Sequence, residues 1–126
     1  MRHKHGPEYK IQKDIITFLR ARGWHVERII GNAYQSGLPD LEAFHPKWGV
    51  RKIEVKKPTG YTFTKAQKRK FPVLEAFGAC IWVLNAATQE QYDLLFGPPN
   101  WRAYWRDSWG EIPDIDKLLA EIEEYE

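Results

Sequence analysis

Two carboxylates and a lysine are the residues of this chain whose types and spacing best suit shared chemistry. Asp40 follows Gly37-Leu38-Pro39, and Glu54 and Lys56 lie fourteen and sixteen positions further along. Carboxylate oxygens are ligands that hard cations such as Mg²⁺ prefer, and a bound cation polarises phosphoryl oxygen and lowers the pKa of its bound water. If the three side chains meet, the chemistry that they suit is phosphodiester hydrolysis.

Neighbouring strands must position these residues. Segments 39–44 and 50–57 have strand-like patterns around a turn at 46–49, which predicts an antiparallel hairpin. Successive side chains of a strand point to opposite faces, so Glu54 and Lys56 share one face. Proline is tolerated at the first residue of a strand, which places Asp40 near the strand start. A plainer interpretation stays open, in which Glu54 and Lys56 form a surface ion pair worth about 0–1 kcal/mol.

Helices are expected on both sides of this hairpin in the sequence. The apolar spacing over 7–22 predicts a helix whose first turn contains Glu8, either as a metal-site residue or as an acid that favours the positive helix end. Thr64 and Gln67 have capping-box spacing and open a second helix over 64–77. Pro72 lies within that range, so we expect a kink or a late start.

The rest of the chain predicts further elements. Residues 24–30 form a strand candidate and 31–37 a polar loop, whereas 80–85 is an apolar run typical of a central strand covered on both faces. Cys80, in that run, is expected to be a small core residue. Further helices are expected over 88–96 and after Asp114.

Composition and charge favour one domain that binds a polyanion. The chain has 126 residues, is 43% hydrophobic and has no apolar run of the ~18 residues that a membrane span needs, so we expect a soluble, intracellular protein. Residues 1–75 hold 16 Lys and Arg against 7 Asp and Glu, whereas 76–126 hold 3 against 10. A basic first half suits nucleic acid, although a solvated basic face is the simpler alternative.

The motifs and their order resemble the PD-(D/E)XK nuclease superfamily, and among its branches the VRR-NUC family of stand-alone phage and bacterial type. The resemblance rests on Glu8 with Gln12, the Gly37-Leu38-Pro39-Asp40 segment, Ile53-Glu54-Val55-Lys56, and Thr64-Lys65-Ala66-Gln67. It implies an α/β fold with a restriction-endonuclease-like core of order αβββαβ, a mixed sheet flanked by helices. Residues 1–126 would form one nuclease domain, with its core at about 7–97 and an aromatic-rich, helical extension over 98–126.

The same resemblance implies roles for individual residues. Asp40, Glu54 and the backbone carbonyl of Val55 would bind Mg²⁺ or Mn²⁺, and Glu8 would hold the metal directly or through water. Lys56 would orient or stabilise the attacking water, and Gln67 would steady Lys56 or contact phosphate. Nucleic-acid contacts are expected from two helices, the 31–37 loop and the end of the hairpin, at Gln12, Asn32, Ser36, Lys57, Lys65, Lys68 and Arg69.

The implied function is that of a metal-dependent, structure-selective DNA endonuclease, and stand-alone relatives suggest a homodimer that resolves four-way (Holliday) junctions in the cytoplasm of a bacterial or phage-infected cell. Aromatic rings interleaved with arginine in segment 101–109 could stack on bases. Packing on its own domain or on a second subunit is favoured instead because 76–126 is acidic, and the segment is therefore our candidate dimer surface. The alternative function is a non-catalytic accessory domain that binds nucleic acid or recruits a partner. The presence of Asp40, Glu54 and Lys56 argues against it.

Overall fold

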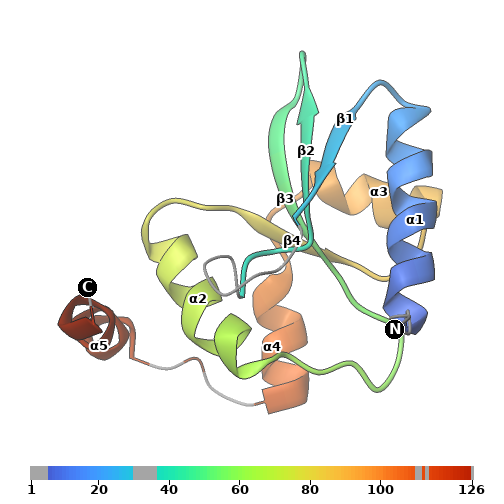
Figure 1. The fold of residues 1–126 in the computed structure, drawn as a ribbon. Helices are drawn as coiled ribbons and strands as arrows, with labels where there is room; N and C mark the ends of the chain where they lie inside the picture. Colours follow the sequence, from blue (N-terminus) through green and yellow to red (C-terminus); the bar gives the residue numbers. More distant parts are fainter. Residues whose placement is uncertain (1–5, 30–36, 110–111, 113, 126) are drawn as a thin grey trace, which may run out of the picture.

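The computed structural model describes residues 6–29, 37–109, 112 and 114–125. The helix-strand order of the first six elements is the expected αβββαβ (Figure 1). In chain order the elements are α1 (Pro7–Arg20), β1 (His25–Arg28), β2 (Leu41–His45), β3 (Gly49–Val55), α2 (Lys65–Ala76), β4 (Ile81–Leu84), α3 (Gln89–Asp93), the 3₁₀ helix η1 (Leu94–Phe96), α4 (Trp101–Trp109) and α5 (Ile115–Tyr125).

The four strands form one mixed sheet in the order β1-β2-β3-β4. β1 and β3 are antiparallel to β2, whereas β4 is parallel to β3. The predicted hairpin and the predicted α/β class are both confirmed. Leu41 pairs with Ile53, so Asp40, one residue before β2, lies across from Glu54.

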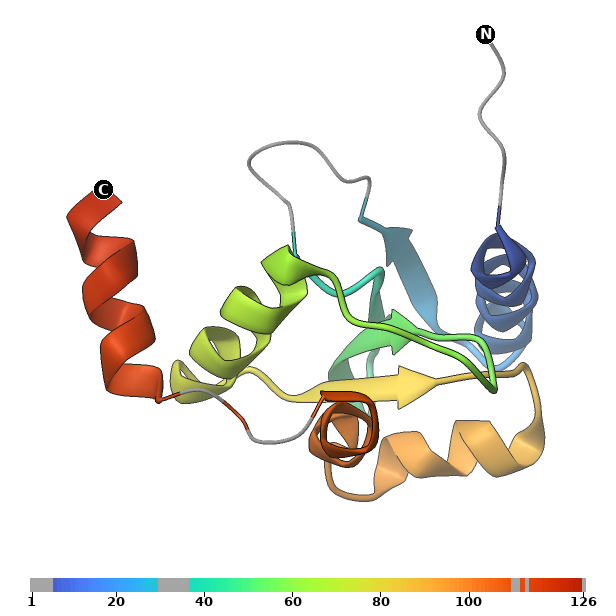
Figure 2. The ribbon, with the colours of Figure 1, turned by 90° about the horizontal axis from the view of Figure 1, so that it is seen from below.

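Each face of the sheet is covered by helices, and each has its own hydrophobic cluster. On one face, α1 and η1 pack through Ile15, Leu19 and Leu95. On the other, α2 and α4 pack through Phe71, Trp101 and Trp105. Figures 1 and 2 show α1 and α2 on opposite sides of the sheet and α5 beyond α2. No helix in the described ranges is long and apolar enough to cross a membrane.

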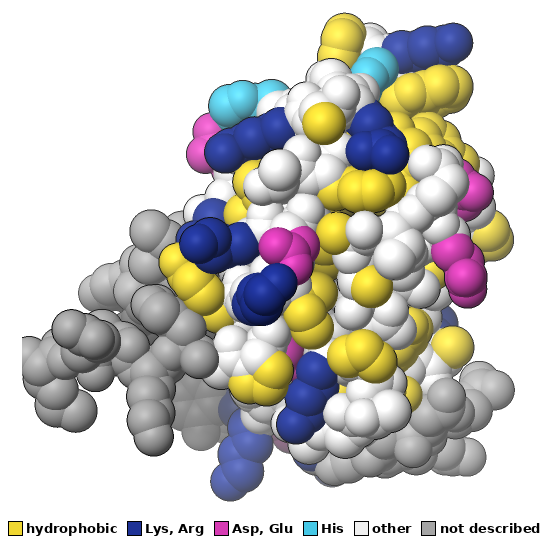
Figure 3. All heavy atoms as spheres, turned by 90° about the vertical axis from the view of Figure 1, so that its right-hand side faces the viewer, with side chains coloured by type: hydrophobic (Ala, Val, Ile, Leu, Met, Phe, Trp, Pro, Cys, Tyr) yellow, Lys and Arg dark blue, Asp and Glu magenta, His cyan; other side chains and the backbone are white. Residues whose placement is uncertain are grey.

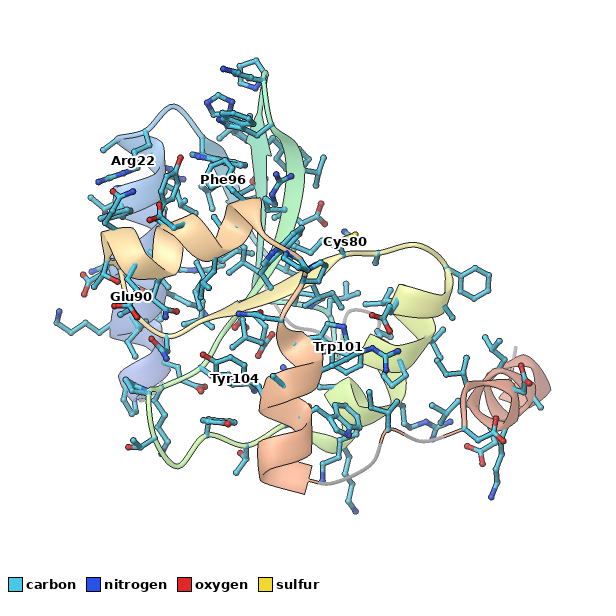
Figure 4. All side chains as sticks on the ribbon, turned by 180° about the vertical axis from the view of Figure 1, so that it is seen from behind. Arg22, Cys80, Glu90, Phe96, Trp101 and Tyr104 are labelled. Atoms are coloured by element: carbon cyan, nitrogen blue, oxygen red, sulfur yellow. The ribbon has the colours of Figure 1, made fainter. Side chains whose placement is uncertain are left out.

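The predicted central position of the 80–85 strand is wrong. β4 is buried at all its residues as expected, yet it lies at an edge of the sheet. Its unpaired edge is satisfied by Asn100, whose Oδ1 accepts from the Val83 amide at 2.6 Å and whose Nδ2 donates to the Val83 carbonyl at 3.1 Å. Cys80, just before the strand, is exposed and is not the core residue expected (Figure 4).

The aromatic segment 101–109 is the helix α4, and its tryptophans belong to the domain's own core. Trp101 is 1% and Trp105 0% exposed, and both contact aromatic rings of the α2 side, Phe71 and Phe63. Figure 4 shows Trp101 on the side of α4 that faces α2. Of the two packing alternatives, own domain or second subunit, these two rings follow the first, so they are not available for a dimer surface.

Candidate active site

Asp40 and Glu54 lie close together at the open end of the β2–β3 hairpin, opposite its turn. The Oδ2 atom of Asp40 accepts a hydrogen bond from the Val55 amide at 2.8 Å, which fixes Asp40 against β3. Glu54 is 2% exposed, although most glutamates lie at the surface. A carboxylate this deeply buried needs polar partners, and α2 supplies them.

Gln67 joins the capping of α2 to this pair. Its backbone amide donates to Thr64 Oγ1 at 3.1 Å, and its Oε1 accepts from the Thr64 amide at 3.0 Å, so the predicted capping box is present. The Nε2 atom of Gln67 donates to Glu54 Oε2 at 2.6 Å. The residue that caps the start of α2 therefore also orients Glu54. Pro72 lies inside the helix and does not delay its start, which is at Lys65.

Lys56 lies behind Glu54 and is surrounded by oxygen acceptors. Its Nζ lies 2.7 Å from the Thr62 carbonyl, 3.0 Å from Gln67 Oε1 and 3.1 Å from Glu54 Oε2, and the side chain is 3% exposed. An ammonium has three hydrogens, so these three oxygens satisfy it completely. Sequence reasoning missed Thr62, because a backbone carbonyl leaves no signal in the residue type. The surface-pair interpretation of Glu54 and Lys56 is wrong, since both are buried.

Glu8 approaches from the first turn of α1. Its Oε2 accepts from the Lys57 amide at 3.2 Å, directly after β3. Glu8 and Lys57 line a hollow of about 260 Å³ together with Thr62, whose carbonyl binds Lys56. The helix start is thus tied to the strand that carries Glu54.

Gly37 sets the approach of the 37–40 segment to α2. It has φ +86°, and a Cβ at this position would lie 2.6 Å from the carbonyl oxygen of Ala66. Only glycine tolerates both this left-handed conformation and this close contact. The glycine of the Gly37-Leu38-Pro39-Asp40 motif therefore allows the backbone that leads to Asp40 to pack closely against the first turn of α2.

The electrostatics of the two carboxylates are coupled. Burial, followed by the negative charge of Asp40, raises the pKa of Glu54 to about 8, against the opposing effects of Lys56 and Gln67. Burial also raises the pKa of Asp40, as Glu8 does, while the Val55 amide, Lys56 and a side-chain hydrogen bond with Glu54 lower it. Adjacent buried carboxylates of this kind resist holding two negative charges without a cation.

One oxygen of Glu54 tests whether these residues fit a cation. Glu54 Oε1 is buried and receives no N–H hydrogen bond from the described residues, since Gln67 and Lys56 both contact Oε2. A hard cation bound by Glu54 and Asp40 would satisfy this oxygen, and Mg²⁺ needs only one or two carboxylates because it keeps several waters. Within the described ranges no three His, Cys, Asp or Glu side chains are grouped to hold a metal ion. The adjacent carboxylates of Asp40 and Glu54 fit a two-carboxylate site, and Glu8, which accepts from the Lys57 amide, lies at its margin.

The expected nucleic-acid contacts lie on several elements. Lys65, Lys68 and Arg69 are in the first half of α2, close to Gln67, but Arg69 Nη2 is also 3.9 Å from Glu121 Oε2 of α5. Gln12 is half-buried on α1. Lys57 follows β3 and lines the hollow that also contains Glu8. Asn32 and Ser36 fall outside the described residues.

Comparison with known proteins supports the fold. No protein-family model matches the chain, and neither does any curated protein. A solved structure described as "VRR_NUC domain" superposes with a TM-score of 0.59 and 24% identity, over 71% of this chain and 95% of that chain. Since that comparison covers nearly the whole of the solved domain, the chain has the fold of a VRR_NUC domain.

Proposed function

We propose that this chain is a Mg²⁺- or Mn²⁺-dependent DNA endonuclease that hydrolyses phosphodiester bonds. The observation that carries the proposal is the buried Glu54 Oε1 atom, which receives no N–H hydrogen bond from the described residues and lies beside a second carboxylate, Asp40. The fold shared with a VRR_NUC domain supports it. A divalent cation bound there would supply Lewis-acid activation of the phosphate and of a water.

The chain's own residues would then have separate tasks. Asp40 and Glu54 would bind the cation, with the Val55 carbonyl as a further oxygen ligand. Lys56, held by three oxygens, would provide a fixed positive charge next to the developing charge on the phosphate. Gln67 would keep Glu54 and Lys56 in position. Glu8, tied to the Lys57 amide, would act through a water at the margin of the site.

The substrate proposed is branched or otherwise structured DNA, including four-way junctions cut by a homodimer. The support is the family resemblance of the motifs and the excess of Lys and Arg in residues 1–75. Two symmetric sites would cut two strands of one junction.

A cleavage assay with labelled four-way junction, flap, duplex and single-stranded DNA tests the activity. The wild-type protein is expected to cut with Mg²⁺ or Mn²⁺ and not with EDTA, and Asp40→Asn and Lys56→Ala are each expected to lower the rate by about 10²-fold or more. Glu42→Gln is the matched control, because Glu42 lies on the same hairpin but pairs with Lys52 at 3.4 Å. It should retain activity.

Three results would count against parts of the proposal. DNA binding by all variants without metal-dependent cutting would favour the accessory-domain alternative. Equal cutting of plain duplex and junction would exclude the junction preference. A monomer in light scattering, with and without junction DNA, would exclude paired cleavage by a homodimer.

A further inference from the structure

A second hollow lies beside the proposed active site, between α1 and β1. It has a volume of about 280 Å³ and is lined by Tyr9, Lys13, Ile16, Thr17, Arg20 and Arg28. Tyr9 also lines the hollow that contains Glu8 and Lys57, so the two hollows share this residue. Figure 3 looks onto this side of the molecule and shows several Lys and Arg side chains on it.

The charges of this second hollow are unbalanced. Lys13, Arg20 and Arg28 line it, and none of the described lining residues is acidic. Among the described residues, none of these three cations forms an ion pair with a carboxylate. The carboxylate of Asp14, on the same helix, is instead paired with Lys10 at 3.0 Å.

Arg28 has a guanidinium nitrogen whose hydrogen-bonding requirement the described residues do not meet. Its Nε is buried and has no acceptor among the described residues. The guanidinium carbon lies 5.0 Å from the centroid of the Tyr9 ring, and Lys13 Nζ lies 5.9 Å from the same centroid. Arg20 points toward the same region and donates to the Val26 carbonyl at 3.3 Å. A buried guanidinium N–H without an acceptor, next to two more cations, suits an anion with several acceptor oxygens.

Register places this hollow at the active-site end of the sheet. Arg28 pairs with Leu41, and the Ile29 amide donates to the Asp40 carbonyl at 2.8 Å. Val26, two residues before Arg28 and on the same face of β1, belongs to the cluster on the α1 side. Glu54 instead contacts Gln67 on the α2 side. A DNA strand that passes Glu8 at the start of α1 would therefore contact Tyr9 and then the three cationic side chains of the second hollow.

We propose that this hollow is a phosphate-binding subsite for the nucleic acid, separate from the carboxylates. Arg28 would bind the phosphate oxygens through its guanidinium, and Lys13 and Arg20 would add positive charge. Tyr9, whose ring lies near Arg28 and Lys13, would form the wall shared with the hollow that contains Glu8. The subsite rests on the proposed function for its ligand. It assigns a binding role to four residues whose spacing in the sequence gave no such indication.

Binding of a short fluorescent single-stranded DNA, measured by anisotropy in EDTA over a series of salt concentrations, tests this subsite. Arg28→Gln and Lys13→Ala are each expected to weaken binding by about three- to tenfold and to lower the slope of log affinity against log salt by about one. Lys10→Ala removes an equal charge from α1 outside the hollow and should change neither quantity appreciably. Lys13 is exposed, so its substitution tests the subsite even if Arg28→Gln fails to fold.

Equal affinities and slopes for Lys13→Ala, Lys10→Ala and the wild type would overturn the subsite. The phosphate bound here is either one in the DNA backbone or the one at a 5′ terminus, and DNA strands with a 5′-phosphate or a 5′-hydroxyl distinguish the two. Only a site for a terminal phosphate would bind the 5′-phosphorylated strand better, and Lys13→Ala would then lose that preference. The outcome is independent of cutting, since EDTA prevents metal binding. Failure of Mn²⁺ to bind the wild type in calorimetry would instead contradict the proposed function.

Discussion

Gln67 links the folding of α2 to the chemistry proposed for β3. The side chain completes a capping box and also contacts Glu54 and Lys56. Sequence reasoning identified the cap from the Thr64–Gln67 spacing, and the family resemblance suggested a contact with Lys56. The contact with Glu54 was not expected, because parity along β3 says which side chains share a face but not which helix covers that face.

We predict that Gln67→Ala lowers metal affinity or cleavage rate by about 10–100-fold, as the loss of a residue that orients a metal ligand does. Gln91→Ala is the matched control. Gln91 is at the same position of the capped helix α3, and its Oε1 also accepts a backbone amide, that of Asn85, at 2.9 Å. Both variants should lose about 1–3 kcal/mol of unfolding free energy. Comparable cleavage rates for the two variants would show that Gln67 only caps α2.

The buried Glu54 also predicts a pH dependence of stability in the absence of metal. Its pKa rises from the ordinary 4.5 to about 8 on folding. Between these values the unfolded chain has lost a proton that the folded protein keeps, so the free energy of unfolding contributed by Glu54 falls as pH rises, by at most about 1.4 kcal/mol per pH unit. Below pH 4.5 and above pH 8 this contribution no longer changes with pH.

Urea unfolding in EDTA at intervals from pH 5 to 8 measures this effect. Other groups titrate in the same range, so the informative quantity is the difference between the wild type and Glu54→Gln. Wild-type stability should decline relative to that of the variant as pH rises. A difference that stays constant with pH would mean that Glu54 is ionised throughout. Added Mn²⁺ should reduce the decline, because the cation stabilises the ionised carboxylate.

At the scale of elements, the hairpin was more predictable than β4. Alternation along 50–57 correctly placed Glu54 and Lys56 together, because a two-residue period depends only on local geometry. The apolar run of β4 correctly predicted burial on both faces but not its place in the sheet. Its free edge is satisfied by the Asn100 side chain, seventeen residues from Val83, and a hydrogen bond over that separation leaves no periodic pattern.

The 37–40 segment gives a prediction at this scale. Gly37→Ala should distort the segment that leads to Asp40, because the new Cβ would be 2.6 Å from the Ala66 carbonyl oxygen. Gly49→Ala is the control, since Gly49 has a similar φ of +82° but nothing within 4 Å of the added Cβ. Both should lose about 1–2 kcal/mol from backbone strain. Gly37→Ala should lose more, and it alone should lower the cleavage rate.

Thermal unfolding and cleavage kinetics of the two glycine variants check this expectation. If both retain the wild-type cleavage rate, the contact between Gly37 and α2 does not position Asp40. If Gly49→Ala loses as much activity as Gly37→Ala, the strain in the hairpin, rather than the close contact, is responsible.

For the molecule as a whole, the 98–126 segment is less separate than its composition suggested. Its acidic charge favoured packing on the domain or on a second subunit over base stacking, and the buried Trp101 and Trp105 show packing on the domain itself. Which surface receives the rings could not be read from periodicity. They fill the α2 side of the sheet beside Phe71, the side from which Gln67 reaches Glu54.

The last prediction follows from this shared core. Trp105→Ala should lower the free energy of unfolding by about 3–5 kcal/mol, because it removes a fully buried ring from the cluster that supports α2. Trp48→Ala removes the same side chain from the hairpin turn, where it is 41% exposed, and should cost about 1 kcal/mol or less. Urea unfolding followed by circular dichroism should show one transition for each protein, at a lower midpoint for Trp105→Ala. A wild-type midpoint for Trp105→Ala would mean that α4 is not integral to the domain that positions Gln67.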